Sequence, residues 1–304
     1  MGIDGFAESV KDGVQEQLGD GYQVTVCETD KNNGVVYTGL KVSKEDSDIS
    51  PLIYLNNHFK EYENGDITLP EVADYVASTS KKKNLGVDMR QFLNYERIKG
   101  CIVYKLVNTE RNRELLEDIP HMEYIDLSIV FQCVMAGETG EIASILIHNV
   151  HMKLWDITVE DLFKAAEENT LRLMGCKLMS MGDVICEIMQ AESPENFDCD
   201  AYRSEFKDFV PMYVLSNKYR IEGAACILYT GLLSEICDQL ESSFYIIPSS
   251  IHETLILPID NTDENEEIRD MIKEVNDTQV SAEDILSYSL YFYDRKEHRL
   301  YIVE

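Results

Sequence analysis

Hydrophobic and polar residues alternate along the first part of this chain in two rhythms, one helical and one extended. Over residues 6–18 apolar side chains recur every fourth position, as they do on one face of a helix. Two strand-like runs follow, at 22–29 and 35–42. The loop between them ends in an Asn-Gly dipeptide, which is typical of a tight hairpin. This region therefore predicts a helix followed by an antiparallel hairpin.

The rest of the chain continues the alternation in runs of strands separated by helices. Thr68 and Glu71 have the spacing of a capping box and predict the start of a helix. Further strands are expected at 52–55, 101–107, 124–135, 142–149, 288–293 and 298–303. Further helices are expected at 110–117, 158–169, 182–190, 267–276 and from 281–284 onward. Strand runs of this kind predict an α+β fold with two mixed, mostly antiparallel sheets.

One stretch predicts a βαβ unit in the C-terminal half. Residues 224–229 have a strand pattern, 231–240 an amphipathic helix pattern, and 244–247 a second strand pattern. A right-handed crossover would make the two strands parallel. The helix start at Thr230-Gly231 would then share one sheet edge with the end of the second strand, where open α/β sheets bind ligands. Free amides at that helix start would favour an anion.

A polar, acidic segment that contains a proline separates two halves of the chain. Residues 191–202 have this composition and are the expected linker. The prediction is an N-terminal α+β domain over 1–190 and a C-terminal α+β domain over 203–304.

Charge and cysteine usage limit the environment and the partners. The chain has 27 Lys and Arg against 56 Asp and Glu, a net charge of −29. Phosphate backbones and anionic membranes would repel such a surface, so direct binding to nucleic acid or membrane is disfavoured. No signal-peptide pattern or bilayer-spanning apolar run is present, and none of the eight cysteines are spaced as Cys-x-x-Cys. We expect a cytoplasmic protein with reduced thiols, no zinc site and no cofactor.

Several short motifs resemble a known family. They are Asn108-Thr109-Glu110-Arg111-Asn112, the run 213–218, Gly223-Ala224-Ala225-Cys226 and the segment 248–253. Together they resemble a bacterial family of unknown function, number 5688, that is common in Clostridia, and the resemblance covers most of the chain. It implies a standalone bacterial cytoplasmic protein, and it implies no activity, cofactor or substrate.

The segment Pro248-Ser249-Ser250-Ile251-His252-Glu253 brings a serine, a histidine and a carboxylate close together in sequence. On a strand, Ser250 and His252 would face the same side about 6.7 Å apart, while Glu253 would face the other side. A hydrolase would need an orienting acid beyond the imidazole ring. The alternative is a turn in which Ser249 and Ser250 cap backbone groups, and this interpretation is favoured.

Other candidate motifs are weaker. His252-Glu253 begins like a zinc-protease motif but lacks the second histidine. His148 and His151 would face opposite sides of a strand, which disfavours a metal site. Asn217 closes an apolar strand and is either a turn residue or one wall of a polar cleft.

These observations predict a non-catalytic binding or regulatory module for an unknown protein or small ligand. The ligand-binding candidates are Thr230, Gly231, Ser249, Ser250, His252 and Asn217. One alternative is a hydrolase or transferase that uses Ser249, Ser250, His252 and Glu253. A second is an acidic mimic of nucleic acid, which would need its carboxylates gathered on one face.

Overall fold

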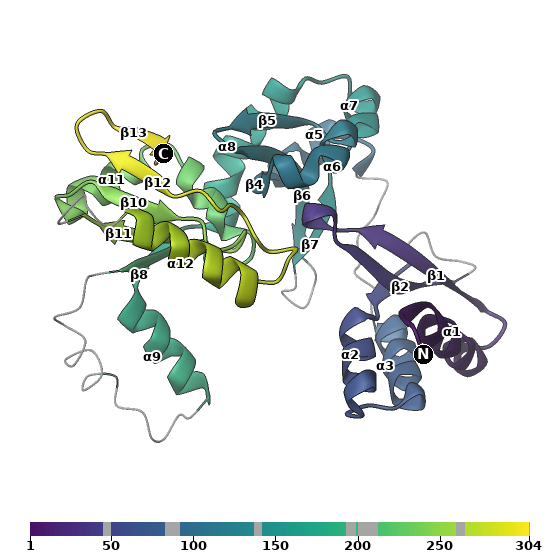
Figure 1. Ribbon diagram of the computed structural model, residues 1–304. Helices are drawn as coiled ribbons and strands as arrows, with labels where there is room; N and C mark the ends of the chain where they lie inside the picture. Colours follow the sequence, from purple (N-terminus) through teal and green to yellow (C-terminus); the bar gives the residue numbers. More distant parts are fainter. Residues whose placement is uncertain are drawn as a thin grey trace. The chain divides into compact units, whose positions relative to one another are not determined.

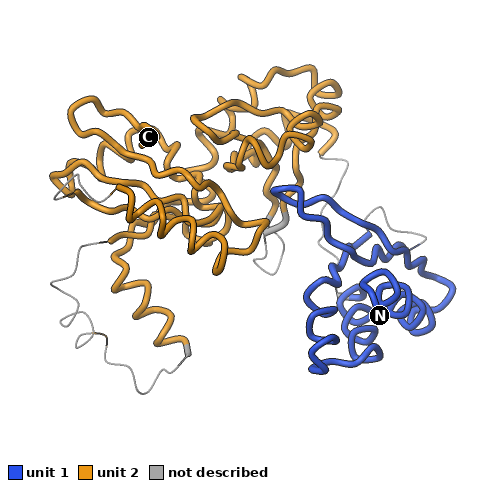
Figure 2. The backbone as a smooth tube through the Cα atoms, viewed as in Figure 1, with its two compact units in different colours: residues 1–91, 136–143 blue, residues 92–135, 144–304 orange. Residues whose placement is uncertain are grey.

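The computed structural model describes residues 1–44, 50–82, 92–136, 142–192, 199, 212–259 and 265–303. The chain divides into two compact units (Figures 1 and 2). Unit 1 comprises residues 1–91 and 136–143, and unit 2 comprises residues 92–135 and 144–304. The linker predicted at 191–202 falls within unit 2, largely outside the described residues, so the domain boundary at that segment stays a prediction.

Unit 1 is a three-stranded antiparallel sheet with helices packed on one face. Its strands lie in the order β1-β2-β3, and apolar residues of α1 and α3 pack with β1 and β2 in one core. The predicted hairpin and the capping box are confirmed, because β1 pairs with β2 and Thr68 donates its N–H to Glu71 at 2.8 Å. The elements are α1 (Ile3–Leu18), β1 (Tyr22–Asp30), η1 (Asn32–Gly34), β2 (Val36–Lys44), β3 (Leu52–Tyr54), α2 (Asn56–Asn64) and α3 (Leu69–Lys82).

Unit 2 contains two further sheets in the part of the chain that the structure describes. One has four strands in the order β4-β6-β5, with β7 also paired to β6. Its elements and nearby helices are α5 (Tyr95–Ile98), η2 (Lys99–Cys101), β4 (Ile102–Asn108), η3 (Glu110–Asn112), α6 (Arg113–Asp118), β5 (His121–Tyr124), β6 (Leu127–Ala136), β7 (Ile142–Leu146), α7 (Asn149–Trp155) and α8 (Val159–Met174).

The second sheet of unit 2 has six strands in the order β13-β12-β10-β11-β9-β8. Helix α12 covers one of its faces through Ile268 and Ile272, which pack with Tyr245 and Ile247. Its elements are β8 (Lys177–Ser180), α9 (Met181–Glu192), β9 (Tyr213–Ser216), η4 (Gly223–Leu228), α11 (Leu232–Leu240), β10 (Phe244–Ile247), β11 (Thr254–Pro258), α12 (Asn265–Thr278), β12 (Tyr291–Asp294) and β13 (Arg299–Ile302).

The α+β class with antiparallel sheets is confirmed, but the βαβ unit is wrong. Residues 223–228 form the 3₁₀ helix η4, and β10 pairs antiparallel with both β11 and β12. The segment is buried in the core that unites the four-stranded and six-stranded sheets. A continuous apolar run suits a buried strand and a buried helical segment equally, so periodicity alone misassigned it.

Two other sequence predictions are corrected. The strand expected at 124–135 is in fact two strands, because Ile125 and Asp126 form the turn between β5 and β6. The helix expected to start at 281–284 is a turn, in which the Asp284 N–H donates to the Ser281 carbonyl at 2.8 Å.

Candidate functional site

The turn between β5 and β6 holds an isoleucine in a backbone conformation that isoleucine rarely adopts. Tyr124 pairs with Leu127, so Ile125 and Asp126 form a two-residue loop. Ile125 has a φ of 59°, in the left-handed region that disfavours β-branched side chains. Positive φ at the first loop residue is the pattern of a type II′ turn, where glycine is usual. The Ile125 side chain is also 42% exposed, so burial does not explain its presence.

The neighbouring Asp126 carboxylate fixes this turn. It accepts hydrogen bonds from the hydroxyls of Ser287 at 2.6 Å, Ser289 at 2.9 Å and Tyr291 at 2.6 Å. Hydrogen bonds to a charged group contribute about 1.5–3 kcal/mol each, whereas a strained backbone costs about 1–3 kcal/mol. The segment 287–291 therefore holds Ile125 in its position despite the strain.

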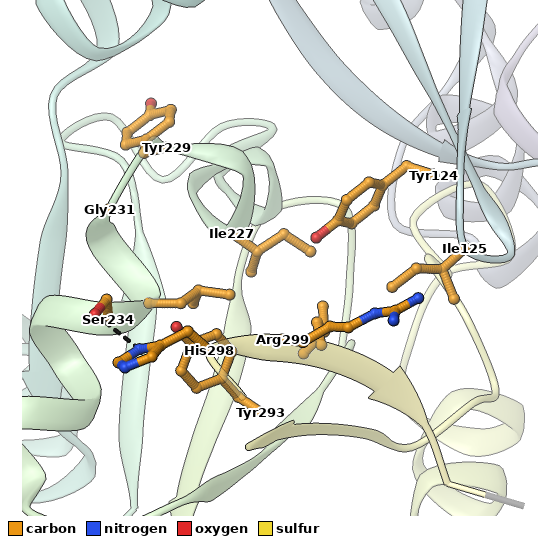
Figure 3. Close-up of a pocket in the computed structure, with 11 residues that line it drawn as sticks. Tyr124, Ile125, Ile227, Tyr229, Gly231, Ser234, Tyr293, His298 and Arg299 are labelled. Atoms are coloured by element: carbon orange, nitrogen blue, oxygen red, sulfur yellow. Dashed lines mark hydrogen bonds between the residues drawn. The ribbon is translucent and has the colours of Figure 1, made fainter. Parts of the chain in front are cut away.

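Ile125 lies at the edge of a cavity of about 540 Å³ within unit 2, hereafter the unit 2 cavity. Eleven residues line it, and they come from the β5–β6 turn, η4, the start of α11 and the β12–β13 hairpin (Figure 3). Ile125, Ile227, Leu233 and Leu300 supply apolar surface. The volume lies in the range of small-molecule sites, about 300–1,000 Å³.

Tyrosine hydroxyls provide polar groups in the unit 2 cavity. The hydroxyl of Tyr124 points into it (Figure 3) and has no partner among the described residues. Burial raises the pKa of Tyr124, and the nearby Tyr293 phenol raises this pKa further. Burial also raises the pKa of Tyr293. A tyrosine phenol is protonated at neutral pH even with its ordinary pKa of about 10, so both phenols can donate hydrogen bonds.

The β12–β13 hairpin brings cationic and imidazole groups to the same cavity. Arg299 and His298 line it, and His298 Nδ1 lies 3.1 Å from the Ser234 hydroxyl of α11. Figure 3 shows the Arg299 side chain extending toward Ile125. None of the eleven lining residues is an aspartate or a glutamate.

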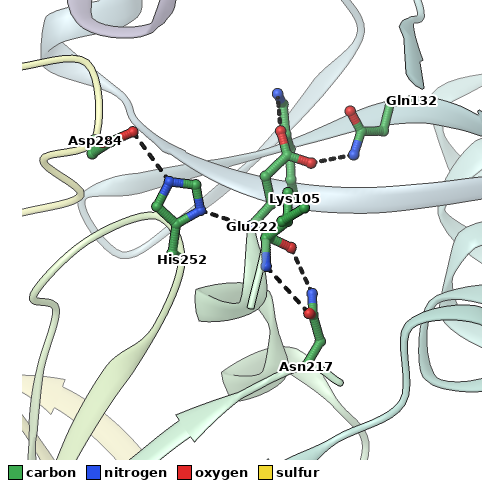
Figure 4. A network of polar contacts seen from close by, with 7 residues as sticks. Lys105, Gln132, Asn217, Glu222, His252 and Asp284 are labelled. Carbon is green, nitrogen blue, oxygen red and sulfur yellow. Dashed lines mark hydrogen bonds and ion pairs between the residues drawn. The ribbon is translucent and has the colours of Figure 1, made fainter. Parts of the chain in front are cut away.

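His252 lies in a separate polar network (Figure 4). Its Nδ1 accepts the backbone N–H of Glu222 at 3.1 Å, so the proton of the neutral ring sits on Nε2. Nε2 lies 3.2 Å from Asp284 Oδ1 and donates to it. Both ring nitrogens are therefore engaged.

The same network links the two sheets of unit 2. The Glu222 carboxylate forms an ion pair with Lys105 of β4 at 2.6 Å and accepts a hydrogen bond from Gln132 of β6. Glu222 has a φ of 54°, and the loop before it is closed by Asn217, whose amide donates to the Ile221 carbonyl at 2.6 Å. The polar groups of this loop mainly satisfy one another.

Comparison with known proteins identifies the family. The model of the family of unknown function DUF5688 matches residues 3–295. The chain belongs to this family. Searches of curated proteins and of solved structures return no match. The resemblance expected from the sequence motifs is thereby confirmed, and the family description adds no activity.

In this DUF5688 protein the residues of the 248–253 segment form a turn. The serine, histidine and glutamate of this turn are not arranged as a nucleophile, a base and an orienting acid. The Ser250 hydroxyl donates to the Glu253 carboxylate at 3.0 Å and accepts the His252 backbone N–H at 3.0 Å. Ser249 donates its backbone N–H to the Ile247 carbonyl at 2.9 Å. No contact between a serine hydroxyl and the His252 ring occurs in the described chain.

The six predicted ligand-binding residues do not share one site. Asn217, Ser250 and His252 belong to the loops around the Glu222 network, whereas Gly231 lines the unit 2 cavity. Thr230, next to Gly231, donates its hydroxyl to Glu167 at 3.0 Å. Sequence reasoning missed Ile125, His298 and Arg299. The only local signal near Ile125 was Asp126, since aspartate is common in turns.

Metal coordination and membrane insertion are two further function classes on which the structure bears. Across the described residues, no group of three or more His, Cys, Asp or Glu side chains is placed to hold a metal ion. Within the same ranges, none of the helices combines the length and the apolar character that crossing a bilayer requires.

Proposed function

We propose that unit 2 is a non-catalytic binding module whose small-molecule ligand occupies the unit 2 cavity. The observation that carries the proposal is Ile125, an exposed, strained, β-branched residue placed at the cavity edge. Strain of this kind persists where the surroundings enforce it, and it concentrates at ligand-binding and active sites. The three hydrogen bonds to Asp126 supply that enforcement.

The composition of the cavity supports the same proposal. Apolar side chains and tyrosine rings form most of its walls, and a few polar groups converge within it. This is the usual make-up of a small-molecule site, in which apolar contacts give affinity and polar groups fix orientation.

The contacts of His252 do not favour the hydrolase alternative. A general base needs a ring nitrogen that faces the nucleophile. In the structure one nitrogen accepts from a backbone amide and the other donates to Asp284, and the Ser250 hydroxyl is bonded to Glu253. These groups instead connect the loops between strands.

The test fills the cavity with a larger side chain at one position of its wall. Ser234→Phe places a ring in the unit 2 cavity, and Ser78→Phe makes the same substitution at an exposed position of α3 in unit 1. Ligand-observed NMR with a mixture of small neutral and charged aromatic compounds measures binding. We expect binding to the wild type and to Ser78→Phe, and loss of binding in Ser234→Phe. No binding to the wild type, or equal binding to Ser234→Phe, contradicts the proposal.

A further inference from the structure

Arg299 is a cation with no anionic partner in the described chain. It lies opposite Asp294 in the β12–β13 register, yet the Asp294 carboxylate accepts the backbone N–H groups of Lys296 at 2.6 Å and Glu297 at 3.1 Å. The guanidinium instead lies over the Tyr301 ring, 5.4 Å from the ring centroid. This is within the limit of about 6 Å for a cation–π contact. Its hydrogen-bond donors thus remain available at the cavity.

Other groups of the unit 2 cavity suit a negative charge as well. Tyr124 offers a protonated hydroxyl that points into the cavity and has no partner in the described ranges. Gly231, Leu233 and Ser234 place the first turn of the nine-residue helix α11 in the wall. Amides at a helix start favour anions, which adds to the effect of the guanidinium.

The absence of carboxylates from the lining is informative because the protein is so acidic. The sequence holds 56 Asp and Glu against 27 Lys and Arg. The eleven lining residues include one arginine, one histidine and no aspartate or glutamate. Their composition therefore differs from the excess of acidic residues in the whole sequence. The lining itself therefore carries the positive charge of Arg299 and no carboxylate, although the whole molecule carries a charge of −29.

We propose that the ligand of the unit 2 cavity is a small, singly charged organic acid, with its carboxylate on Arg299 and an apolar or aromatic body against Ile125, Ile227 and Leu300. An arginine fork matches a carboxylate in a bidentate manner. One guanidinium balances one charge, and the field of the acidic protein opposes every additional charge on the ligand. A dianionic phosphate ester is therefore disfavoured. This inference rests on the proposed function, since it specifies the ligand of the same cavity.

Three compounds that share a naphthalene ring test the inference in the full-length chain. They are 2-naphthoate, its neutral amide 2-naphthamide, and 2-naphthyl phosphate, titrated by calorimetry. We expect naphthoate to bind the wild type about 10- to 100-fold more tightly than the amide, as a charged hydrogen-bonded pair implies. We also expect naphthoate to bind more tightly than the phosphate. Equal affinity for naphthoate and the amide overturns the inference, and so does tighter binding of the phosphate.

Substitutions then assign the preference to Arg299. In Arg299→Gln the affinity for naphthoate should fall to within about twofold of that for the amide, while Arg299→Lys should keep part of the preference because it retains the charge. Lys296→Gln removes a charge from an exposed position in the same turn and should leave the preference intact. A preference that survives in Arg299→Gln overturns the inference.

The outcomes separate the two proposals. Binding of the amide and naphthoate with equal affinity, lost in Ser234→Phe, contradicts the carboxylate inference and supports the binding module. If none of the three compounds binds and the aromatic mixture also shows no binding, both proposals are overturned. Thermal unfolding of each variant confirms that it is folded.

Discussion

At the scale of single residues, one hairpin turn places a strained residue at the edge of the unit 2 cavity. Ile125 occupies a position where glycine would be favoured, and its neighbour Asp126 supplies the hydrogen bonds that hold it there. Isoleucine does not stabilise the backbone conformation of such a turn, because its β-branched side chain disfavours positive φ. Its apolar side chain at the edge of the unit 2 cavity is therefore the feature that the turn preserves.

Ile125→Gly should make the protein more stable and its binding weaker. Glycine removes the left-handed strain, which stabilises the folded protein by about 1–2 kcal/mol. Its greater conformational entropy in the unfolded chain offsets about 0.5–1 kcal/mol of this gain. We expect the free energy of unfolding in urea to rise by up to about 1 kcal/mol, while the affinity for the cavity ligand falls several-fold. Asp156→Gly is the matched control, since Asp156 is left-handed with a φ of 53° but does not line the cavity. A less stable Ile125→Gly protein with unchanged binding would contradict this view of the turn.

At the scale of elements, amphipathic helices, half-buried strands and the buried strands β4 and β10 could be predicted from the sequence, whereas the type of the fully buried segment η4 could not. The helix at 3–18 and the hairpin of β1 and β2 each have a polar face that reveals their period. In η4 the five residues from Gly223 to Ile227 are all buried, so no polar position marks the helical turn. The predicted βαβ unit failed for that reason.

The candidate site was predicted only in part, for a related reason. Gly231 was expected at a helix start beside a ligand, and it does line the unit 2 cavity at the start of α11. The other walls come from hairpin turns that are remote in sequence. Which turns meet is decided by the packing of two sheets, and no local pattern contains that information.

Gly223→Ala should destabilise the connection between η4 and the six-stranded sheet. A Cβ at Gly223 would lie 2.5 Å from the His252 carbonyl oxygen and 2.6 Å from the Asn217 nitrogen, and backbone atoms cannot move aside cheaply. We expect a loss of about 3 kcal/mol or more in the free energy of unfolding, measured by urea denaturation. Gly100→Ala, with no atom within 4 Å of its added Cβ, should change stability little. Similar effects of the two substitutions would refute the close packing at Gly223.

At the scale of the whole molecule, each unit has a core of its own. The core of unit 1 is built on residues such as Val10, Leu40 and Val76, all without exposed surface. The main core of unit 2 joins its two sheets through η4. Unit 2 also buries a group of tyrosines, which gives the molecule a characteristic response to alkaline pH.

Stability should fall at high pH because of these tyrosines. Burial raises the pKa of Tyr124, Tyr229 and Tyr291 above the ordinary value of 10.0. Because the pKa of each of these tyrosines is higher in the folded than in the unfolded protein, its contribution to the free energy of unfolding is complete below pH 10. This contribution is lost as the pH rises toward the folded-state pKa values. We expect the free energy of unfolding in urea to be steady near pH 8–9 and to decline above about pH 10. The Tyr291→Phe protein should have a lower free energy of unfolding at neutral pH, and this free energy should fall less steeply above about pH 10. Ionisation of all tyrosines near pH 10 without a loss of stability would contradict the prediction.

The contact between Tyr291 and Asp126 joins residues 165 positions apart in the sequence. Closing so long a loop costs entropy, and distant contacts of this kind form late in folding. During synthesis the β5–β6 turn leaves the ribosome well before the segment that secures it. Until residues 287–300 arrive, the turn lacks its three hydroxyl donors and the cavity lacks one wall. The unit 2 cavity is therefore complete only after the β12–β13 hairpin has been added.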